Sequence, residues 1–298
     1  MSQLVQVGKD TYYIDLPSKV GVYRVAPGSA ILIDSSSYES ARKIEAVLEE
    51  NGLRPQAIVN THSHADHIGC NAYLQEKYNC PIYANGIEVE FIREPLLAAC
   101  YLYGAYPYKL MRHSFLMGKA SQCQYLDPGN LPAGFEVAPL YGHAMGMIAL
   151  KTPDNIWFTG DIACAPSILE KYPLAFVHNT TRYLASLDEA RELKGELFIC
   201  SHADPTASLD ELLDFNKETM ERMIDYTWEA CQDGPQSFET ILARVCALCK
   251  LNLNFMLRAN MGSTVKAHIS HLVDSRRLKP LMEENILKYQ ALSPGEAR

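Results

Sequence analysis

The stretch NTHSHADHIG (residues 60–69) places three of the chain's nine histidines and an aspartate within six positions. It directly follows the apolar run AIV (57–59), which has the composition of a buried strand. Imidazole and carboxylate groups are the ligands that zinc and similar divalent metals bind. A cluster of this density at the end of a strand therefore predicts a metal site, whose remaining ligands must come from other parts of the chain.

Composition limits the classes of protein to consider. The 298-residue chain is 48% hydrophobic and 21% charged, which is ordinary for a globular protein with a large core. No basic segment followed by an apolar one opens the sequence, and no apolar run is long enough to span a bilayer, so neither a signal peptide nor a membrane partner is expected. Nine cysteines without a repeated spacing indicate a reducing, cytoplasmic location. The formal charge of −8 argues against a general attraction to nucleic acid or anionic membranes.

Short β-branched runs alternate with helical patterns over the first 205 residues. Strands are expected within 6–16, 20–26, 29–34, 55–61, 80–85, 135–143, 147–155, 156–161 and 196–204, and helices within 37–52, 70–79 and 186–195. The last helix is predicted to begin at Ser186, with Glu189 completing a capping box. This alternation predicts a layered α/β core.

From about residue 208 the pattern changes to helices, expected within 209–234, 238–249 and 264–278, with Gly234-Pro235 and the segment around Gly262 between them. The predicted organisation is a main domain over 1–207 and a small, mostly helical C-terminal domain over 208–298. Residues 91–125 break the earlier rhythm and are rich in Tyr, Leu and Met. They fit a lid or wall over an apolar pocket and a pair of ordinary core helices about equally well.

Seven candidate metal ligands lie where strands meet loops. They are His62, His64, Asp66 and His67 in the opening stretch, His143 in YGHAMG, Asp161 in FTGD, and His202 in CSHAD. Strand ends at one edge of a sheet converge, and rigid strands hold ligands to the tolerance that a metal site needs. Seven ligands are too many for one tetrahedral ion but fit two ions that share a bridging carboxylate. The sequence therefore predicts a two-metal site.

The run from His62 to His67 resembles the H-x-H-x-D-H signature of the metallo-β-lactamase-fold hydrolases, and the later candidates follow in the order of that family's later motifs. The resemblance covers about residues 1–205 and implies an αββα sandwich with the metals at one edge. It implies that His62, His64 and His143 hold the first metal, that Asp66, His67 and His202 hold the second, and that Asp161 bridges them. Asp34, which ends the run LID, resembles an aspartate that orients ligands and backbone.

By the same resemblance the cofactors are two divalent ions, zinc in the first place, with iron and manganese as alternatives. The two ions would acidify a shared water and generate hydroxide at neutral pH. Asp66 and His202 are expected to act in catalysis as well as in metal binding. His64 stands where flavin-linked di-iron members carry Glu, and Asp161 where secreted lactamases often carry Cys, so neither of those branches is expected.

The C-terminal run 264–281 resembles the small winged-helix-like domain that closes several cytoplasmic members, including the lactamase-β-2-like group, some of which cut single-stranded RNA. His268 and His271 in this run are expected to be ordinary surface or core residues rather than ligands. Cys246 and Cys249 are most simply interpreted as one face of a helix.

Three functions remain from the sequence. The leading hypothesis is a hydrolase of an ester, thioester, lactone or related acyl bond in a small-molecule substrate; the glyoxalase II-like group is one candidate, although no basic glutathione-binding cluster is visible. The alternative is a single-strand endoribonuclease or phosphodiesterase, which rests on the basic run 258–279. The third is a non-catalytic metal-binding module, which the complete ligand set disfavours. Nothing in the sequence indicates an oligomeric state.

Overall fold

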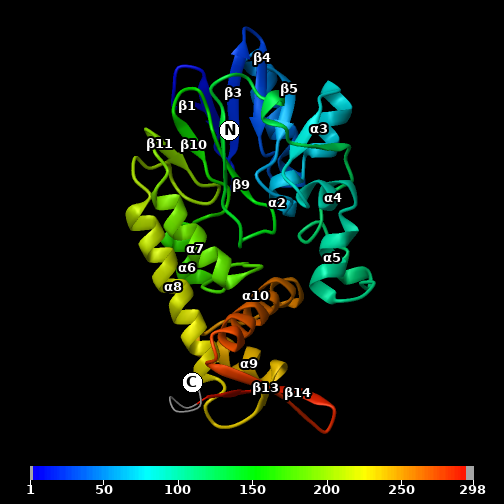
Figure 1. The fold of residues 1–298 in the computed structure, drawn as a ribbon. Coiled ribbons are helices and arrows are strands. Elements are labelled where there is room, and N and C mark those ends of the chain that lie inside the picture. Colours follow the sequence, from blue (N-terminus) through cyan, green and yellow to red (C-terminus); the bar gives the residue numbers. More distant parts are fainter. Residues whose placement is uncertain (1–2, 293–298) are drawn as a thin grey trace.

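The computed structural model describes residues 3–292, and two β-sheets packed face to face form its centre, with helices on both outer sides (Figure 1). The αββα sandwich that the resemblance implies is therefore confirmed. A mostly helical C-terminal region packs below one end of the sandwich in this view.

The first sheet follows the chain order from β1 to β7 within the described residues. Its strands are β1 (Leu4–Gln6), β2 (Thr11–Ile14), β3 (Val20–Ala26), β4 (Ser29–Ile33), β5 (Arg54–Val59), β6 (Ile82–Ala84) and β7 (Cys123–Tyr125). Strands β1 to β4 pair antiparallel, and β4 to β7 pair parallel. Side chains of β4 alternate between two cores: Ala30 and Leu32 join the outer one, and Ile31 and Ile33 the inner one. Burial on both faces explains why this strand has a continuous apolar sequence.

The second sheet has the order β11-β10-β9-β8 among the described residues. Its strands are β8 (Glu136–Pro139), β9 (Ile148–Lys151), β10 (Ile156–Phe158) and β11 (Leu197–Ile199). Ile148, Leu150 and Phe158 pack in the same inner core as Ile33 and Val59 of the first sheet. The two sheets are therefore held together by apolar side chains that alternate with those facing the helices.

Helices cover the outer faces of both sheets. In the first 207 residues they are η1 (Tyr38–Ser40), α1 (Ala41–Glu50), α2 (Ala65–Ile68), α3 (Asn71–Tyr78), α4 (Glu88–Arg93), α5 (Leu96–Tyr103), η2 (Lys109–Met111), η3 (Pro128–Asn130), α6 (Pro166–Lys171) and α7 (Thr180–Arg191). Ile44 and Leu48 of α1 and Leu74 of α3 pack against the first sheet. Leu187 of α7 belongs to the apolar cluster that includes Trp157 of β10.

The predicted capping box at Ser186 is wrong. Helix α7 already begins at Thr180, because the side chain of Asn179 accepts a hydrogen bond from the backbone N–H of Arg182. Ser186 is buried inside the helix, where its hydroxyl donates to the carbonyl of Tyr141.

The C-terminal region contains the three expected helices and, in addition, a small sheet of order β12-β14-β13 within the described residues. Its elements are α8 (Asp210–Glu229), β12 (Gln236–Ser237), α9 (Phe238–Leu248), α10 (Phe255–Asp274), β13 (Leu278–Glu283) and β14 (Ile286–Ala291). The helical character is confirmed, and β13 and β14 form an antiparallel hairpin. Glu284 and Asn285 at its turn both have positive φ angles, of 51° and 63°. Glutamate is uncommon in such a turn, so the sequence carried no hairpin signal.

Gly262 was expected to lie between helices, and this is wrong as well. Helix α10 begins at Phe255, because the side chain of Asn254 accepts hydrogen bonds from the N–H groups of Met256 and Leu257. Gly262 lies in its middle, on the face that packs towards Leu242 of α9. No helix within residues 3–292 is both long and apolar enough to cross a membrane.

Candidate metal centre and its cavity

The seven predicted ligands come together at one edge of the sandwich. His62 and His64 lie on the loop after β5, Asp66 and His67 on α2, and His143, Asp161 and His202 after β8, β10 and β11. They form two groups, His62, His64 and His143 in one and Asp66, His67, Asp161 and His202 in the other. Within each group one ligand atom per residue lies within 4.8 Å of the others. The structure thus brings together every residue of the predicted set.

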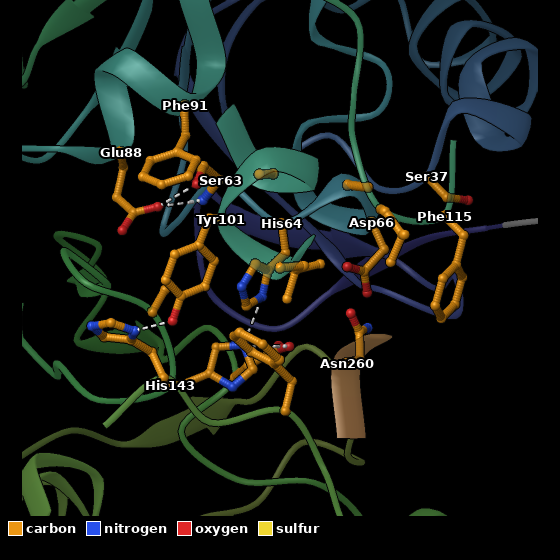
Figure 2. A pocket seen from close by; sticks show the side chains of 18 of the residues that line it. Ser37, Ser63, His64, Asp66, Glu88, Phe91, Tyr101, Phe115, His143 and Asn260 are labelled. Atoms are coloured by element: carbon orange, nitrogen blue, oxygen red, sulfur yellow. Dashed lines mark hydrogen bonds and ion pairs between the residues drawn. The ribbon is translucent and has the colours of Figure 1, made fainter. Parts of the chain in front are cut away.

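The first group consists of three imidazoles directed at one point. His64 Nδ1 lies 3.0 Å from His62 Nε2 and 2.9 Å from His143 Nε2 (Figure 2 draws the His64–His143 contact). Nitrogen ligands of one tetrahedral zinc ion are about 3.3 Å apart, given bonds of about 2.0–2.1 Å. Burial lowers the pKa of all three rings, that of His64 to about 3. The rings are therefore neutral at neutral pH, which is the form that binds metal.

The second group surrounds the carboxylate of Asp161. Its Oδ2 lies 3.3 Å from His202 Nε2 and 3.5 Å from His143 Nε2, and its Oδ1 lies 3.2 Å from His67 Nε2. Oδ1 is nevertheless buried without a hydrogen bond among the described residues. A buried carboxylate oxygen left without a donor, between two groups of ligands, fits a bridging metal ligand.

Electrostatic interactions within the second group keep its carboxylates ionised and its histidines protonated. Burial opposes ionisation of Asp161, but His202 and His67 hold the pKa of this carboxyl well below its usual range. Burial would likewise lower the pKa of His67, yet Asp161, Asp66 and Asp34 together raise it well above the ordinary value. Burial would also lower the pKa of His202. Asp161 and Asp66 nevertheless raise it well above the ordinary value. Without metal, these histidines carry the positive charge that divalent ions would otherwise supply.

Asp34 contacts the backbone, one ligand directly and a second ligand through Thr61. Its Oδ1 accepts a hydrogen bond from the N–H of Thr61, and its Oδ2 lies 2.9 Å from His67 Nδ1. A carboxylate only accepts, so Nδ1 of His67 donates to Asp34 and Nε2 is the ring nitrogen that faces Asp161. The hydroxyl of Thr61 also donates to Asp34, so its oxygen is free to accept from Nδ1 of His62, 3.0 Å away. Asp34 thereby orients both rings with Nε2 towards the centre.

Glu88 is a buried residue that sequence reasoning missed. Its carboxylate accepts hydrogen bonds from the N–H (2.9 Å) and hydroxyl (2.5 Å) of Ser63, as Figure 2 shows, and from the N–H of Gly146 (2.7 Å). It therefore joins the loop of His62 and His64 to the loop of His143. No local pattern marks a glutamate at the start of a helix as such a tether, because its partners are far away in sequence.

Gly69, which follows α2, lies where two backbone segments approach each other closely. It has helical backbone angles, and a Cβ on it would lie 2.3 Å from the backbone nitrogen of Tyr38. Close approach of two backbones, rather than a turn, excludes a side chain here. His268 and His271 bond to Thr180 and Thr181, far from both ligand groups in agreement with expectation.

A cavity of about 450 Å³ opens beside the ligands. His64, Asp66, His143 and Asp161 line one side of it. Phe91, Tyr101 and Phe115, from the segment 91–125, line it as well, so this segment is a wall of the cavity (Figure 2). Phe176 closes the wall near the first group, with its ring centroid 4.9 Å from that of His64.

The C-terminal region also contributes to the cavity. Asn260 of α10 lines it and points towards Asp66 in Figure 2. Helix α10 is fixed against the sandwich by Thr264, which accepts a hydrogen bond from the N–H of Val177 and donates to the carbonyl of Ala175. Met111, Leu116 and Ala259 form a small apolar cluster between the 91–125 segment and α10.

Known proteins resemble this chain over the sandwich. A hydroxyacylglutathione hydrolase of Xanthomonas axonopodis pv. citri (strain 306) is 26% identical over 198 residues, which cover 61% of this chain and 64% of that protein. A probable metallo-hydrolase of Bacillus subtilis (strain 168) is 30% identical over 124 residues, covering 40% of this chain and 55% of that protein. The matches therefore span less than two thirds of the length of these curated relatives.

Solved structures resemble the whole chain. A metallo-beta-lactamase family protein of Thermus thermophilus superposes with a TM-score of 0.74 at 18% identity, over 95% of this chain and 99% of its own. A beta-lactamase domain protein of Burkholderia ambifaria has a TM-score of 0.73 at 19% identity, over 97% of this chain and 93% of its own. At such identities the likeness is one of fold, and it includes the C-terminal helices.

The family model of the metallo-beta-lactamase superfamily matches residues 13–202. This range is well over half of the chain, and it contains both groups of ligands that the fold brings together. By sequence as well as by fold, the chain belongs to the metallo-β-lactamase superfamily.

Proposed function

We propose that this protein is a metal-dependent hydrolase that cleaves an ester, thioester, lactone or related acyl bond of a small molecule. The observation that carries the proposal is the pair of ligand groups around Asp161, open to a cavity of small-molecule size. The hydroxyacylglutathione hydrolase among the relatives supports an acyl bond as the target.

We assign His62, His64 and His143 to a first divalent ion and Asp66, His67 and His202 to a second, with Asp161 between them. Zinc suits the mixture of imidazole and carboxylate, and iron or manganese is the alternative. Ions held there would supply Lewis acidity and acidify a water molecule. His62 and His67 are prepared for this by Asp34, which directs their Nε2 atoms inwards.

We assign to Asp66 and His202 a part in the reaction itself. The side chain of Asp66 is 45% exposed and faces the cavity, and its Oδ2 lies 3.1 Å from His202 Nε2. Partial burial opposes its ionisation, but His67 and His202 lower the pKa of Asp66, so its carboxylate is charged and accepts a hydrogen bond from a water in the cavity. His202 is itself held by a hydrogen bond from Nδ1 to the carbonyl of Pro17. The pair thus orients water against an acyl carbon at the mouth of the centre.

The RNA alternative has less support. Two of the five cations in its basic run are paired within the C-terminal region: Arg258 bonds to Glu239 at 2.6 Å, and Arg277 bonds to Asp225 at 2.9 Å. Helix α10, which carries much of this run, packs against the sandwich and lines the cavity. These contacts favour a structural role for the C-terminal region in a small-molecule site.

The proposal is tested with metal-loaded protein and a panel of esters, thioesters and lactones, together with metal analysis. We expect turnover and two bound ions per chain. Asp161→Asn is expected to reduce the metal content and to lower kcat/KM by more than about 100-fold, because the carboxylate shared by both groups is lost. Turnover of no acyl substrate by protein that holds two ions would reject the proposal.

A further inference from the structure

Beyond the ligand groups the cavity is lined mainly by large apolar side chains. They are Phe91, Tyr101, Leu102, Phe115 and Leu116, with Phe176 beside the first group and a few polar residues such as Ser114 and Asn260 among them. The apolar side chains come from the 91–125 segment and from the loop before α7. An acyl chain bound with its carbonyl at the centre would extend along this surface.

Positive charge is missing from these walls. Of the described residues that line the cavity, none is lysine or arginine. The lining includes the acidic residues Glu39 and Asp66 and, outside the ligand groups, two histidines, His113 and His178. Burial lowers the pKa of His178 and its Nδ1 is engaged by the hydroxyl of Tyr101, and Nδ1 of His113 accepts a hydrogen bond from the N–H of Phe115, so neither ring supplies a cation.

These walls distinguish substrates by charge. A carboxylate or phosphate at the distal end of an acyl chain would lose water without gaining a cation, which costs several kcal/mol. A methyl end would instead gain about 0.8 kcal/mol for each buried methylene. The difference is set by these walls and does not depend on the ligand groups.

We propose that the cavity binds acyl groups without charge and discriminates against acyl groups that end in an anion. This inference rests on the proposed function and specifies its substrate class. The proposal also excludes substrates whose acyl group ends in an anion that the cavity walls would have to bind.

The test compares p-nitrophenyl hexanoate with p-nitrophenyl hydrogen adipate, which have the same chain length and leaving group. In both, the oxygen of water bonds to the acyl carbon, the bond from that carbon to the phenolic oxygen breaks, and a proton of the water passes to the phenolate. We expect kcat/KM at least about tenfold higher for the hexanoate, because only the adipate buries an unpaired charge. An adipate ester cleaved as well as the hexanoate would overturn the selectivity and leave the hydrolase intact.

Phe115 supplies the matched variants, because it lines the cavity and is 48% exposed, so a substitution there does not disturb a core. Phe115→Lys adds a cation to the wall and is expected to raise the adipate-to-hexanoate ratio at least about tenfold, whereas Phe115→Leu leaves it unchanged. Equal ratios in the two variants would contradict the proposal.

A binding measurement separates this inference from the proposed function. Metal-loaded wild-type, Phe115→Lys and Phe115→Leu proteins are titrated calorimetrically with hexanamide and with adipamate, neither of which has a reactive ester. Adipamate is expected to gain affinity relative to hexanamide only in Phe115→Lys. If adipamate gains affinity in this way but no substrate of the ester, thioester and lactone panel is turned over, the hydrolase is rejected and the selectivity is retained. If adipamate gains no relative affinity in Phe115→Lys, the selectivity is rejected whatever the activity.

Discussion

Glu88 and Ser63 are joined by two hydrogen bonds, from the N–H and the hydroxyl of Ser63 to the carboxylate of Glu88. Ser63 lies between two ligands, His62 and His64, and the same carboxylate also accepts from Gly146, three residues beyond His143. One buried side chain therefore sets the distance between two loops that must present three imidazoles to one point. The centre depends on this tether although Glu88 contacts none of the ligands.

Replacing Glu88 is expected to weaken metal binding. In Glu88→Ala three buried donors lose their acceptor, which costs about 1–3 kcal/mol for each group left unpaired. Glu88→Gln keeps one acceptor oxygen and is expected to fold, with a metal affinity about 10- to 100-fold lower. Glu90→Gln, on the exposed side of α4, is the control. Competition with a metal-sensitive dye gives the affinities, and an unchanged affinity in Glu88→Gln would refute the role of the tether.

Asp34→Asn should disturb the centre without disturbing the backbone. Asp34 has φ of 63°, and asparagine tolerates this conformation as well as aspartate does. The amide would present a donor where a carboxylate oxygen now faces the Nδ1 atom of His67, which opposes the tautomer that directs Nε2 inwards.

We expect about a 10- to 100-fold loss of metal affinity in Asp34→Asn and a lower melting temperature of the metal-free protein, because the amide no longer balances the charge of buried His67. Asp154→Asn is the matched control, because Asp154 also accepts from a backbone N–H and a threonine hydroxyl, but far from the centre. Equal affinities in the two variants would show that Asp34 does not orient the ligands.

The seven ligands could be predicted from the sequence because metal chemistry restricts the residue types and strands restrict their positions. His143, Asp161 and His202 each follow a short apolar run, and such runs end at a common edge. Asp34 could be predicted for the same reason, since it ends β4. Most strands of the sandwich followed from their β-branched composition, whereas β7 and the three strands of the C-terminal sheet were not expected.

What could not be predicted depends on contacts between distant segments. The role of Glu88 could not be predicted, because it depends on two loops that meet only in the folded structure. Asn260 faces the cavity only because α10 packs against the sandwich, and the pattern of α10 alone did not show even where that helix begins. The start of α7 was misplaced because Ser186 has a local cap pattern, while Asn179 caps the helix in fact. Local rules fail where a tertiary contact satisfies the same polar group.

His268 predicts a pH dependence of stability. It is fully buried, its Nδ1 pairs with Thr180, and its Nε2 has no partner among the described residues. Burial, and then the neighbouring His271, lower its pKa to about 3. In the unfolded chain the pKa of this side chain is about 6.5. Below that pH the unfolded state binds a proton that the folded state does not bind, so the free energy of unfolding falls. The contribution to stability is complete above about pH 6.5 and is lost as the pH falls towards 3.

At pH 5.5 the loss is about 1.4 kcal/mol for this group, one pH unit below the unfolded pKa. We expect the free energy of unfolding to fall from pH 7.5 to 5.5 by about that amount more in the wild type than in His268→Gln. Urea denaturation of metal-free protein at both values measures it. Ser270→Ala, an exposed change on the same helix, should follow the wild type. Identical pH slopes in the wild type and His268→Gln would contradict the assignment.

Asn260 tests whether the C-terminal region takes part in substrate binding. Its amide lines the cavity, faces Asp66, and has no hydrogen-bond partner among the residues that the structure describes. Asn260→Ala therefore removes nothing that stabilises the fold, and its melting temperature should match that of the wild type. In a bound complex the amide would gain a hydrogen bond worth about 0.5–1.5 kcal/mol, so KM should rise about three- to tenfold in the variant while kcat changes little. Ser270→Ala, outside the cavity on the same helix, should leave both constants unaltered. A KM for Asn260→Ala equal to that of Ser270→Ala would mean that α10 only supports the wall, because a side chain that bonds the substrate cannot be removed without loss of affinity.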